Sequence, residues 1–327
     1  MCFCVEIVAK TNRIASIFVF EYILQKGVNM KSVFEGCGVA LVTPFKNKEI
    51  DFENLKKIID NDLHKGAKAI VVLATTGEGT TISETEREQI IKFCRKLTFR
   101  KAKLIIGTGN NNFEVCKRYT KMAKKLGADA ALVVTPYYNK TTQTGLVKYY
   151  QNLAKLKFPM IMYNVPSRTG LMIELDTVKK IIETNQYVYG IKESTTDIAR
   201  ISKLCEICKN KIAVYSGEDA LNFVFYCLGG SGAVSVTANI FADKIQKVYD
   251  LTKAGKIESA LELQRKLFKI DDVLFCETNP VPVKYFMSLC AGMSEDVRLP
   301  LVKLSNKNKS KVKKVFELCS KEKWFDK

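Results

Sequence analysis

Histidine is almost absent from this chain of 327 residues, which contains only His64. This scarcity restricts metal chemistry, because zinc sites in proteins are usually completed by cysteine and histidine side chains. Cys205 and Cys208 form the only Cys-x-x-Cys pair in the sequence. We interpret both as buried or half-buried thiols, with a zinc or redox pair as the minor alternative, and expect no metal site. His64 falls in an amphipathic pattern and is interpreted as a surface or helix-end residue.

The sequence also lacks a disulfide framework, a long apolar run and any nucleic-acid-binding motif. Its 11 cysteines are odd in number and scattered, which favours free thiols in the cytoplasm. No stretch approaches the length of a transmembrane helix, so no membrane association is expected. The chain has 34 acidic residues, Asp and Glu, against 52 basic ones, Lys and Arg. The lysines are spread along the whole chain and do not form one basic cluster. We therefore expect no nucleic-acid partner, although a basic surface would help to collect small anions.

What the sequence does contain is a regular alternation of apolar, β-type runs with amphipathic helical segments. Residues 31–255 are predicted to form an α/β domain, a (β/α)8 TIM barrel, and residues 256–327 a C-terminal helical appendage. Residues 1–30 do not fit this pattern and are interpreted as a dispensable leader, with a targeting peptide as the minority interpretation. The predicted strands are 38–42, 69–74, 104–106, 130–134, 160–163, 187–191, 212–215 and 232–236. The predicted helices are 52–65, 84–97, 114–126, 146–156, 175–183 and 220–228.

Lys192 follows a short apolar run and therefore stands at the carboxyl end of the sixth predicted strand. In (β/α)8 barrels the active site is built at these ends. An amine placed there can be neutral and can attack a carbonyl carbon to form a Schiff base. The alternative is a lysine whose stem lies along the sheet while its ammonium group reaches water. This segment alone leaves both interpretations open.

Polar side chains recur at the same end of other predicted strands. Thr75 and Thr76 follow the second strand, in a turn whose glycines can direct backbone N–H groups at a carboxylate. Tyr138 follows the fourth strand, and Tyr163 and Arg168 belong to the end of the fifth. Phenols can relay protons, and an arginine can hold a carboxylate by a bidentate pair. Their recurrence at one end of the barrel indicates an active site.

Four motifs in this order resemble those of the dihydrodipicolinate synthase family: TTGE at 75–78, TPYYNK at 135–140, YNVPSRTG at 163–170 and GIKES at 190–194. The resemblance runs from about Val33 to the C-terminal helices and includes SGED at 216–219, GGSG at 229–232 and NPVPVK at 279–284. The lysine and TTGE motifs alone would indicate only the wider superfamily of pyruvate-dependent class I aldolases and N-acetylneuraminate lyases. The arginine in YNVPSRTG favours the synthases.

The resemblance implies the condensation of pyruvate with L-aspartate 4-semialdehyde to 4-hydroxy-tetrahydrodipicolinate, in the diaminopimelate route of lysine biosynthesis. Lys192 would form the imine with pyruvate, and the remaining catalytic residues, which relay protons, would be Tyr163, Tyr138 and Thr75. Thr76 would bind the carboxylate of pyruvate and Arg168 that of the semialdehyde. The implied pocket is completed by Gly217 and Val234.

The resemblance further implies no cofactor and a homotetramer, arranged as a dimer of dimers. In this arrangement Tyr138 would complete the site of the neighbouring subunit. Two alternatives remain for the function. One is a related pyruvate-dependent aldolase, either an N-acetylneuraminate lyase or a keto-deoxy sugar acid aldolase. The other, from a different class, is a non-catalytic barrel that binds or regulates.

Many members of the family are inhibited by lysine at a dimer interface, and the resemblance places four residues near such a site: Tyr137, Asn111, Glu84 and Arg87. Two departures argue against inhibition of this chain. The stretch 109–114 is one residue shorter than in regulated members. Arg87 also stands where those members often carry histidine, and its charge would repel the ammonium group of a bound lysine. We therefore expect weak inhibition or none.

Overall fold

Eight short parallel strands close into a barrel in the computed structural model of the chain, which describes residues 30–325. The order around the barrel is β1-β10-β9-β8-β7-β6-β5-β4, and β1 pairs with β4 to complete it. Most strand residues are buried, as their nearly continuous apolar sequences predict for a sheet covered on both faces. The strands are β1 (Gly36–Ala40), β4 (Ala69–Val72), β5 (Lys103–Gly107), β6 (Ala130–Val134), β7 (Met160–Asn164), β8 (Val188–Glu193), β9 (Ala213–Ser216) and β10 (Gly232–Ser235). The predicted TIM barrel is confirmed.

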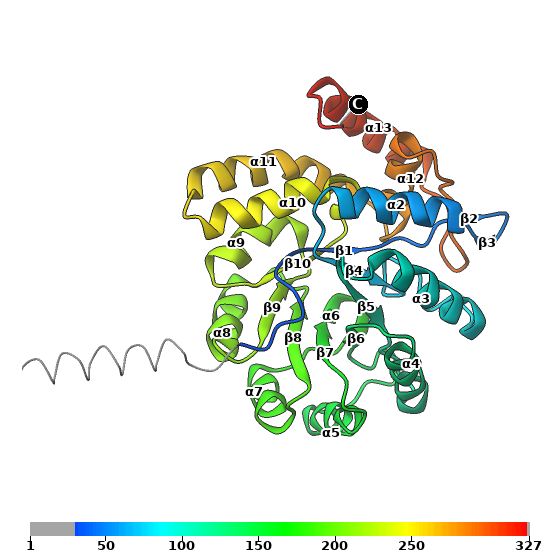
Figure 1. Cartoon of the computed structure of the whole chain (residues 1–327). Helices are drawn as coiled ribbons and strands as arrows, with labels where there is room; N and C mark the ends of the chain where they lie inside the picture. The colour runs from blue at the N-terminus through cyan, green and yellow to red at the C-terminus, as the bar shows by residue number, and fades with distance from the viewer. Residues whose placement is uncertain (1–29, 326–327) are drawn as a thin grey trace, which may run out of the picture.

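Helices surround the strands and follow them along the chain (Figure 1). They are α2 (Phe52–His64), α3 (Glu84–Thr98), α4 (Phe113–Lys125), α5 (Gln143–Ala154), α7 (Leu175–Thr184), α8 (Ile198–Cys208), α9 (Asn222–Cys227) and α10 (Ala238–Lys253). The start of α5 lies three residues before the predicted one, because the Thr142 hydroxyl caps the helix by accepting a hydrogen bond from Gly145 N at 3.1 Å. The predicted helix 220–228 is instead a short 3-10 turn, η1 (Asp219–Leu221), followed by α9.

A small hairpin, β2 (Phe45–Lys46) and β3 (Glu49–Ile50), was not predicted. Its strands have two residues each, which is too short for an apolar alternation to be recognised. The turn between them contains Asn47 and Lys48, both with positive φ, 52° and 69°. Two consecutive residues with positive φ are typical of the tight turns that join antiparallel strands.

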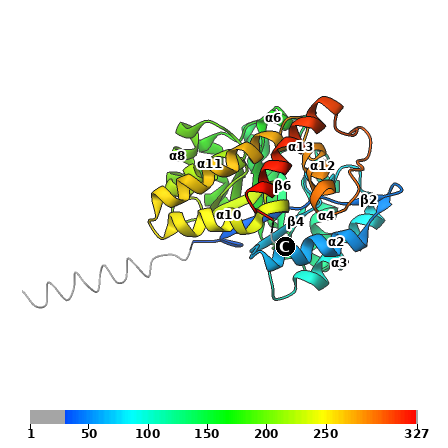
Figure 2. The same ribbon diagram turned by 90° about the horizontal axis from the view of Figure 1, so that it is seen from above.

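Three further helices follow the barrel: α11 (Ile257–Leu274), α12 (Val281–Cys290) and α13 (Asn306–Lys321). They lie together on one side of the molecule (Figures 1 and 2). Phe286 of α12 and Phe316 of α13 pack edge to face, with ring centroids 5.8 Å apart. Among residues 30–325, no helix is both long and apolar enough to cross a membrane. The expected leader, except for Met30, lies outside the described residues.

Candidate active site

Lys192 and Tyr163 lie side by side at the carboxyl ends of β8 and β7. The register of the two strands pairs Tyr163 directly with Lys192. The Lys192 Nζ atom lies 4.4 Å from the centroid of the Tyr163 ring, and each residue is only 6% exposed. The lysine is therefore buried beside a phenol, which agrees with the first of the two interpretations of its segment and not with a solvated ammonium group.

The charges around Tyr163 change its acidity. Burial by itself would raise the pKa of the phenol, but the neighbouring ammonium group of Lys192 and the Thr75 hydroxyl outweigh this effect. The guanidinium group of Arg168 acts in the same direction, so the pKa of Tyr163 lies below its ordinary value. A phenol of lowered pKa is a better donor and acceptor of protons near neutral pH.

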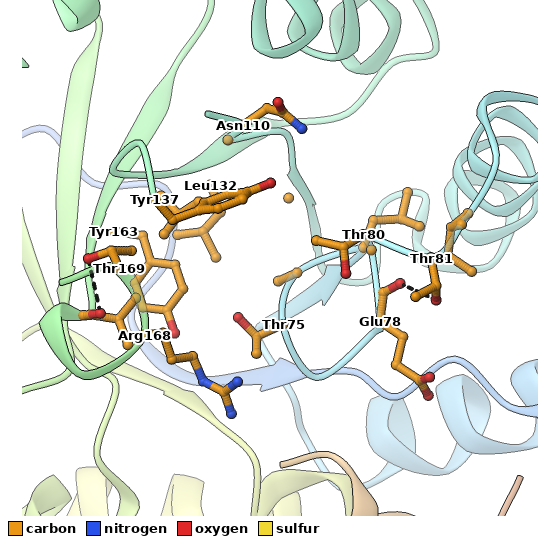
Figure 3. A pocket seen from close by; sticks show the side chains of 18 of the residues that line it. Thr75, Glu78, Thr80, Thr81, Asn110, Leu132, Tyr137, Tyr163, Arg168 and Thr169 are labelled. Atoms are coloured by element: carbon orange, nitrogen blue, oxygen red, sulfur yellow. Dashed lines mark hydrogen bonds between the residues drawn. The ribbon is translucent and has the colours of Figure 1, made fainter. Parts of the chain in front are cut away.

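A cavity of about 330 Å³ opens beside this pair, at the carboxyl ends of the strands. Its wall includes Thr75, Tyr163 and Arg168, whose side chains point into one shared space (Figure 3). Lys192 itself is not part of the lining and stands against Tyr163. The cavity thus brings together a hydroxyl from the loop after β4 with a phenol and a cation from the end of β7.

Arg168 reaches the cavity from a loop that follows β7 and contains the short helix α6 (Pro166–Thr169). Its Nη2 atom donates to the main-chain oxygen of Asn279 at 3.1 Å. The side chain of Asn279 donates in turn to Thr76 Oγ1 at 3.0 Å. Asn279 therefore joins the two residues that were predicted to hold substrate carboxylates. Its motif, NPVPVK, was recognised in the sequence, but no role was predicted for it.

Gly217 lies against the catalytic lysine candidate. A Cβ atom at this position would stand 2.7 Å from Lys192 Cε and 2.1 Å from Ser194 Oγ, so only glycine leaves room for the lysine side chain. Thr76 and Val234, at 3% and 1% exposed, are buried and are not part of the cavity lining. Val234 lies in β10 and pairs with Gly38 of β1.

Tyr138 lies outside this cavity in the single chain. It is 92% exposed and has a positive φ of 68°, whereas the adjacent Tyr137 is part of the lining. A large aromatic side chain held almost entirely in solvent is unusual, because its burial would be favourable. The structure therefore brings three of the four predicted catalytic residues together and leaves Tyr138 apart.

The residues predicted near a lysine site are also divided. Arg87 is 3% exposed and, with Tyr137, lines the cavity. Its guanidinium group donates to Gly107 O at 2.9 Å and Gly79 O at 2.7 Å and lies 4.0 Å from the Tyr119 ring centroid. Glu84 binds Arg118 Nε at 3.1 Å, and neither Glu84 nor Asn111 belongs to the lining.

A buried ion pair, which the sequence reasoning missed, holds the loop that contains Thr75. Lys284 of α12 contacts Glu78 Oε1 at 2.5 Å, and both side chains are almost completely buried. The other carboxylate oxygen of Glu78 accepts a hydrogen bond from Arg298 N at 3.0 Å. Burial lowers the pKa of Lys284 to about 8, although Glu78 favours the charged form. No local pattern signals a contact between residues so distant in sequence.

Comparison with known proteins identifies close relatives along most of the chain. Residues 33–318 match the sequence model of the Dihydrodipicolinate synthetase family. A 4-hydroxy-tetrahydrodipicolinate synthase of Thermodesulfovibrio yellowstonii is 42% identical over 284 residues, which are 86% of this chain and 97% of that protein. The crystal structure of dihydrodipicolinate synthase from Thermotoga maritima has a TM-score of 0.86 at 36% identity and covers 88% of this chain and 99% of that one. A structure described as a monomeric dihydrodipicolinate synthase variant also has a TM-score of 0.86, at 36% identity, covering 90% and 99%.

Proposed function

The chain belongs to the dihydrodipicolinate synthetase family, and we propose that it uses the amine of Lys192 to carry out the condensation of this family. The reaction joins pyruvate to L-aspartate 4-semialdehyde and yields 4-hydroxy-tetrahydrodipicolinate, a step of lysine biosynthesis. The single observation that carries the assignment to Lys192 is its position, buried against Tyr163 and beside a cavity that contains Arg168.

The proposed chemistry follows from these positions. In its deprotonated form the amine of Lys192 attacks the ketone carbon of pyruvate, and Tyr163 supplies the proton with which water leaves. The resulting imine accepts electrons as the methyl group of pyruvate loses a proton, which gives an enamine. The enamine carbon then attacks the aldehyde of the second substrate, whose carboxylate is held by Arg168. The amine of that substrate finally displaces Lys192 and closes the ring.

Two measurements test this proposal. Borohydride reduction in the presence of pyruvate is expected to attach one reduced pyruvyl group to the protein, on the peptide that contains Lys192. Initial rates are expected with pyruvate and aspartate semialdehyde, and none with pyruvate and N-acetylmannosamine. Turnover of the sugar alone would favour the related aldolases, and a protein that pyruvate and borohydride leave unmodified would exclude imine chemistry.

We further propose that the chain acts as a homotetramer in the cytoplasm, with Tyr138 inserted into the active site of a neighbouring subunit. The exposure of this tyrosine, 92%, supports the assembly, because a second chain would bury it. All nine cysteines among the described residues are free thiols, in agreement with a reducing compartment.

Mixing two variants with different defects tests the role of Tyr138. We expect Tyr138→Phe to lower turnover by roughly 10²-fold, because a relay hydroxyl is lost, while pyruvate trapping on Lys192 persists. Lys192→Arg lacks the nucleophile but retains Tyr138. Refolding the two variants together should restore part of the activity, since some sites then combine an intact Lys192 with a Tyr138 from the neighbour. If mixing restores nothing, Tyr138 does not act across subunits.

Millimolar L-lysine is expected to inhibit the enzyme weakly or not at all. Arg87 places a buried positive charge on the cavity wall, and its hydrogen-bond partners there are main-chain oxygens. Helix α4 begins one residue before its predicted start, yet Glu114 is 70% exposed and pairs with Lys117 at 3.2 Å. A lysine titration of the initial rate tests this expectation. Strong, saturable inhibition below about 1 mM, which corresponds to roughly 4 kcal/mol of binding, would contradict it.

A further inference from the structure

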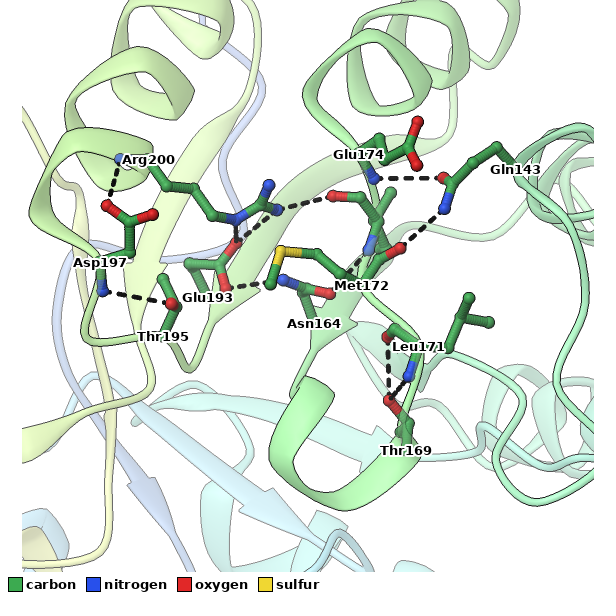
Figure 4. A network of polar contacts seen from close by, with 11 residues as sticks. Gln143, Asn164, Thr169, Leu171, Met172, Glu174, Glu193, Thr195, Asp197 and Arg200 are labelled. Carbon is green, nitrogen blue, oxygen red and sulfur yellow. Dashed lines mark hydrogen bonds and ion pairs between the residues drawn. The ribbon is translucent and has the colours of Figure 1, made fainter.

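A buried polar network lies directly behind Lys192 and Tyr163, on the side of β7 and β8 that faces the helices. Glu193 accepts from Asn164 Nδ2 at 2.7 Å through one carboxylate oxygen, and from Arg200 Nε and Nη2 at 3.2 and 3.0 Å through the other. Arg200 belongs to α8, and at 8% exposed it is the most accessible of the three. Figure 4 shows these contacts as one connected set.

The register of the strands ties this network to the reacting pair. Tyr163 pairs with Lys192, and the next residues along the same strands, Asn164 and Glu193, pair with each other. Because successive side chains of a strand point to opposite faces, the first two face the site and the second two face the helices. The hydrogen bond between Asn164 and Glu193 therefore fixes the two strand ends on which the lysine and the phenol stand.

The same network fixes the loop that carries Arg168. This loop leaves β7 after Asn164 and returns at Ile173, whose N–H donates to Asn164 Oδ1 at 3.0 Å. The main-chain oxygen of Ile173 accepts from Arg200 Nη2 at 2.7 Å. On either side of Ile173, Gln143 donates to Met172 O at 2.9 Å and accepts from Glu174 N at 3.1 Å. Both ends of the Arg168 loop are thus attached to the strand ends that hold the reacting pair.

The network contains a buried ion pair between Glu193 and Arg200. Burial raises the pKa of Glu193, and Arg200 and Asn164 oppose this shift. A buried ion pair is costly to desolvate, so it is weak evidence for stabilisation and is better explained by the geometry it imposes. Among the described residues, the hydrogen bonds of the Arg200 guanidinium group go either to Glu193 or to the returning end of the loop.

We propose that Asn164, Glu193 and Arg200 are positioning residues for the second substrate, holding the Arg168 loop at a fixed distance from Lys192. The proposal rests on the function proposed above. It predicts different effects on the two halves of the reaction. The imine with pyruvate requires only Lys192 and its immediate neighbours, whereas attack on the aldehyde requires Arg168 to hold that substrate at the enamine carbon. Loosening the network should therefore impair the second half of the reaction more than the first.

Arg200→Lys tests the proposal, because it keeps the charge opposite Glu193 but cannot also span to Ile173 O. We expect kcat/KM for aspartate semialdehyde to fall by roughly 10- to 100-fold, mainly through a higher KM, since a small misplacement of a substrate-holding group has effects of this size. The rate of pyruvate trapping by borohydride should stay within about two-fold of the unmodified protein. Arg95→Lys is the matched control. Arg95 forms an ion pair at 2.9 Å with Asp129, the residue before β6, and its substitution should change neither rate.

Gln143→Ala provides a second, milder test, because this half-buried residue contacts the returning end of the loop only at Met172 O and Glu174 N. It should raise the KM for aspartate semialdehyde in the same direction but by less. Equal losses in trapping and condensation for Arg200→Lys, or no change in KM for either variant, would overturn the proposal. Failure of the unmodified protein to trap pyruvate would instead reject the proposed function, so the two failures are distinguishable.

Discussion

Replacing Lys192 with arginine is expected to leave the protein folded and to lower its condensation rate by roughly 10⁴-fold or more. A guanidinium group stays protonated at any pH at which the protein is folded, so it has no free electron pair with which to add to a ketone. Arginine is otherwise a close match in length and charge, and the positive charge beside Tyr163 would remain. Initial rates and intact mass after treatment with pyruvate and borohydride measure the effect.

Lys284 is a second lysine on which pyruvate could be trapped, so the trapping experiment must distinguish it from Lys192. It is the other buried lysine among the described residues, and burial lowers its pKa to about 8, so it is the next candidate for a reactive amine. Its amine is nevertheless held by the carboxylate of Glu78, and Lys284 itself is not part of the cavity lining. Peptide mapping should therefore find pyruvate on Lys192 and none on Lys284, and Lys56→Arg at the surface should retain full activity. Ordinary turnover by Lys192→Arg would mean that another residue is the nucleophile.

Tyr163→Phe should lower turnover by about 10²- to 10⁴-fold, the usual range for a positioned proton donor or acceptor. The variant should still form the pyruvate imine, but more slowly, because water must then leave without the phenolic proton. The pH dependence should change as well. The pKa of Tyr163 is lowered from 10, so the fraction with the proton falls as pH rises through a value below 10. The activity of the unmodified enzyme should therefore fall as pH rises above the pKa of Tyr163. The Phe variant should not show this alkaline decrease in its pH–rate profile.

Tyr150→Phe is a matched control for this substitution. Tyr150 is fully buried in α5 and donates one hydrogen bond to Val133 O at 3.0 Å, away from the cavity lining. Its loss should cost about 1 kcal/mol of unfolding free energy and leave the rate unchanged. If Tyr163→Phe lowers only stability, as Tyr150→Phe should, and spares turnover, then Tyr163 is not part of the proton relay.

The strands and helices could be predicted because their apolar periodicity is local. The carboxyl end of β8 could not be predicted from this local periodicity. Its apolar run predicts a strand that stops at Ile191, but the strand continues through Lys192 and Glu193, both paired in register with β7. Charged residues conceal a buried strand end, because their burial depends on partners that the local sequence does not contain. For Glu193 this partner is Arg200, seven residues further along and on a different element.

The candidate site was predicted where side chains follow strand ends, as for Thr75, Tyr163 and Lys192. Asn279 and Lys284 could not be found in this way, since each contacts a residue about 200 positions earlier in the chain. Their segment lies beyond the last strand, where no barrel rule assigns a role. In the sequence, only the motif that contains both residues indicated a function. The structure shows that Asn279 contacts Thr76 and that Lys284 contacts Glu78.

The contacts made by the C-terminal segment mean that the parts of the site are synthesised at different times. The chain is synthesised from its amino end, so Lys192 and Tyr163 are added before Asn279, Lys284 and Arg298. Until they arrive, the carboxylate of Glu78 has no partner and Arg168 lacks the oxygen it binds. Within one chain, the surroundings of Arg168, Thr76 and Glu78 are therefore complete only when the segment after the barrel has folded against it.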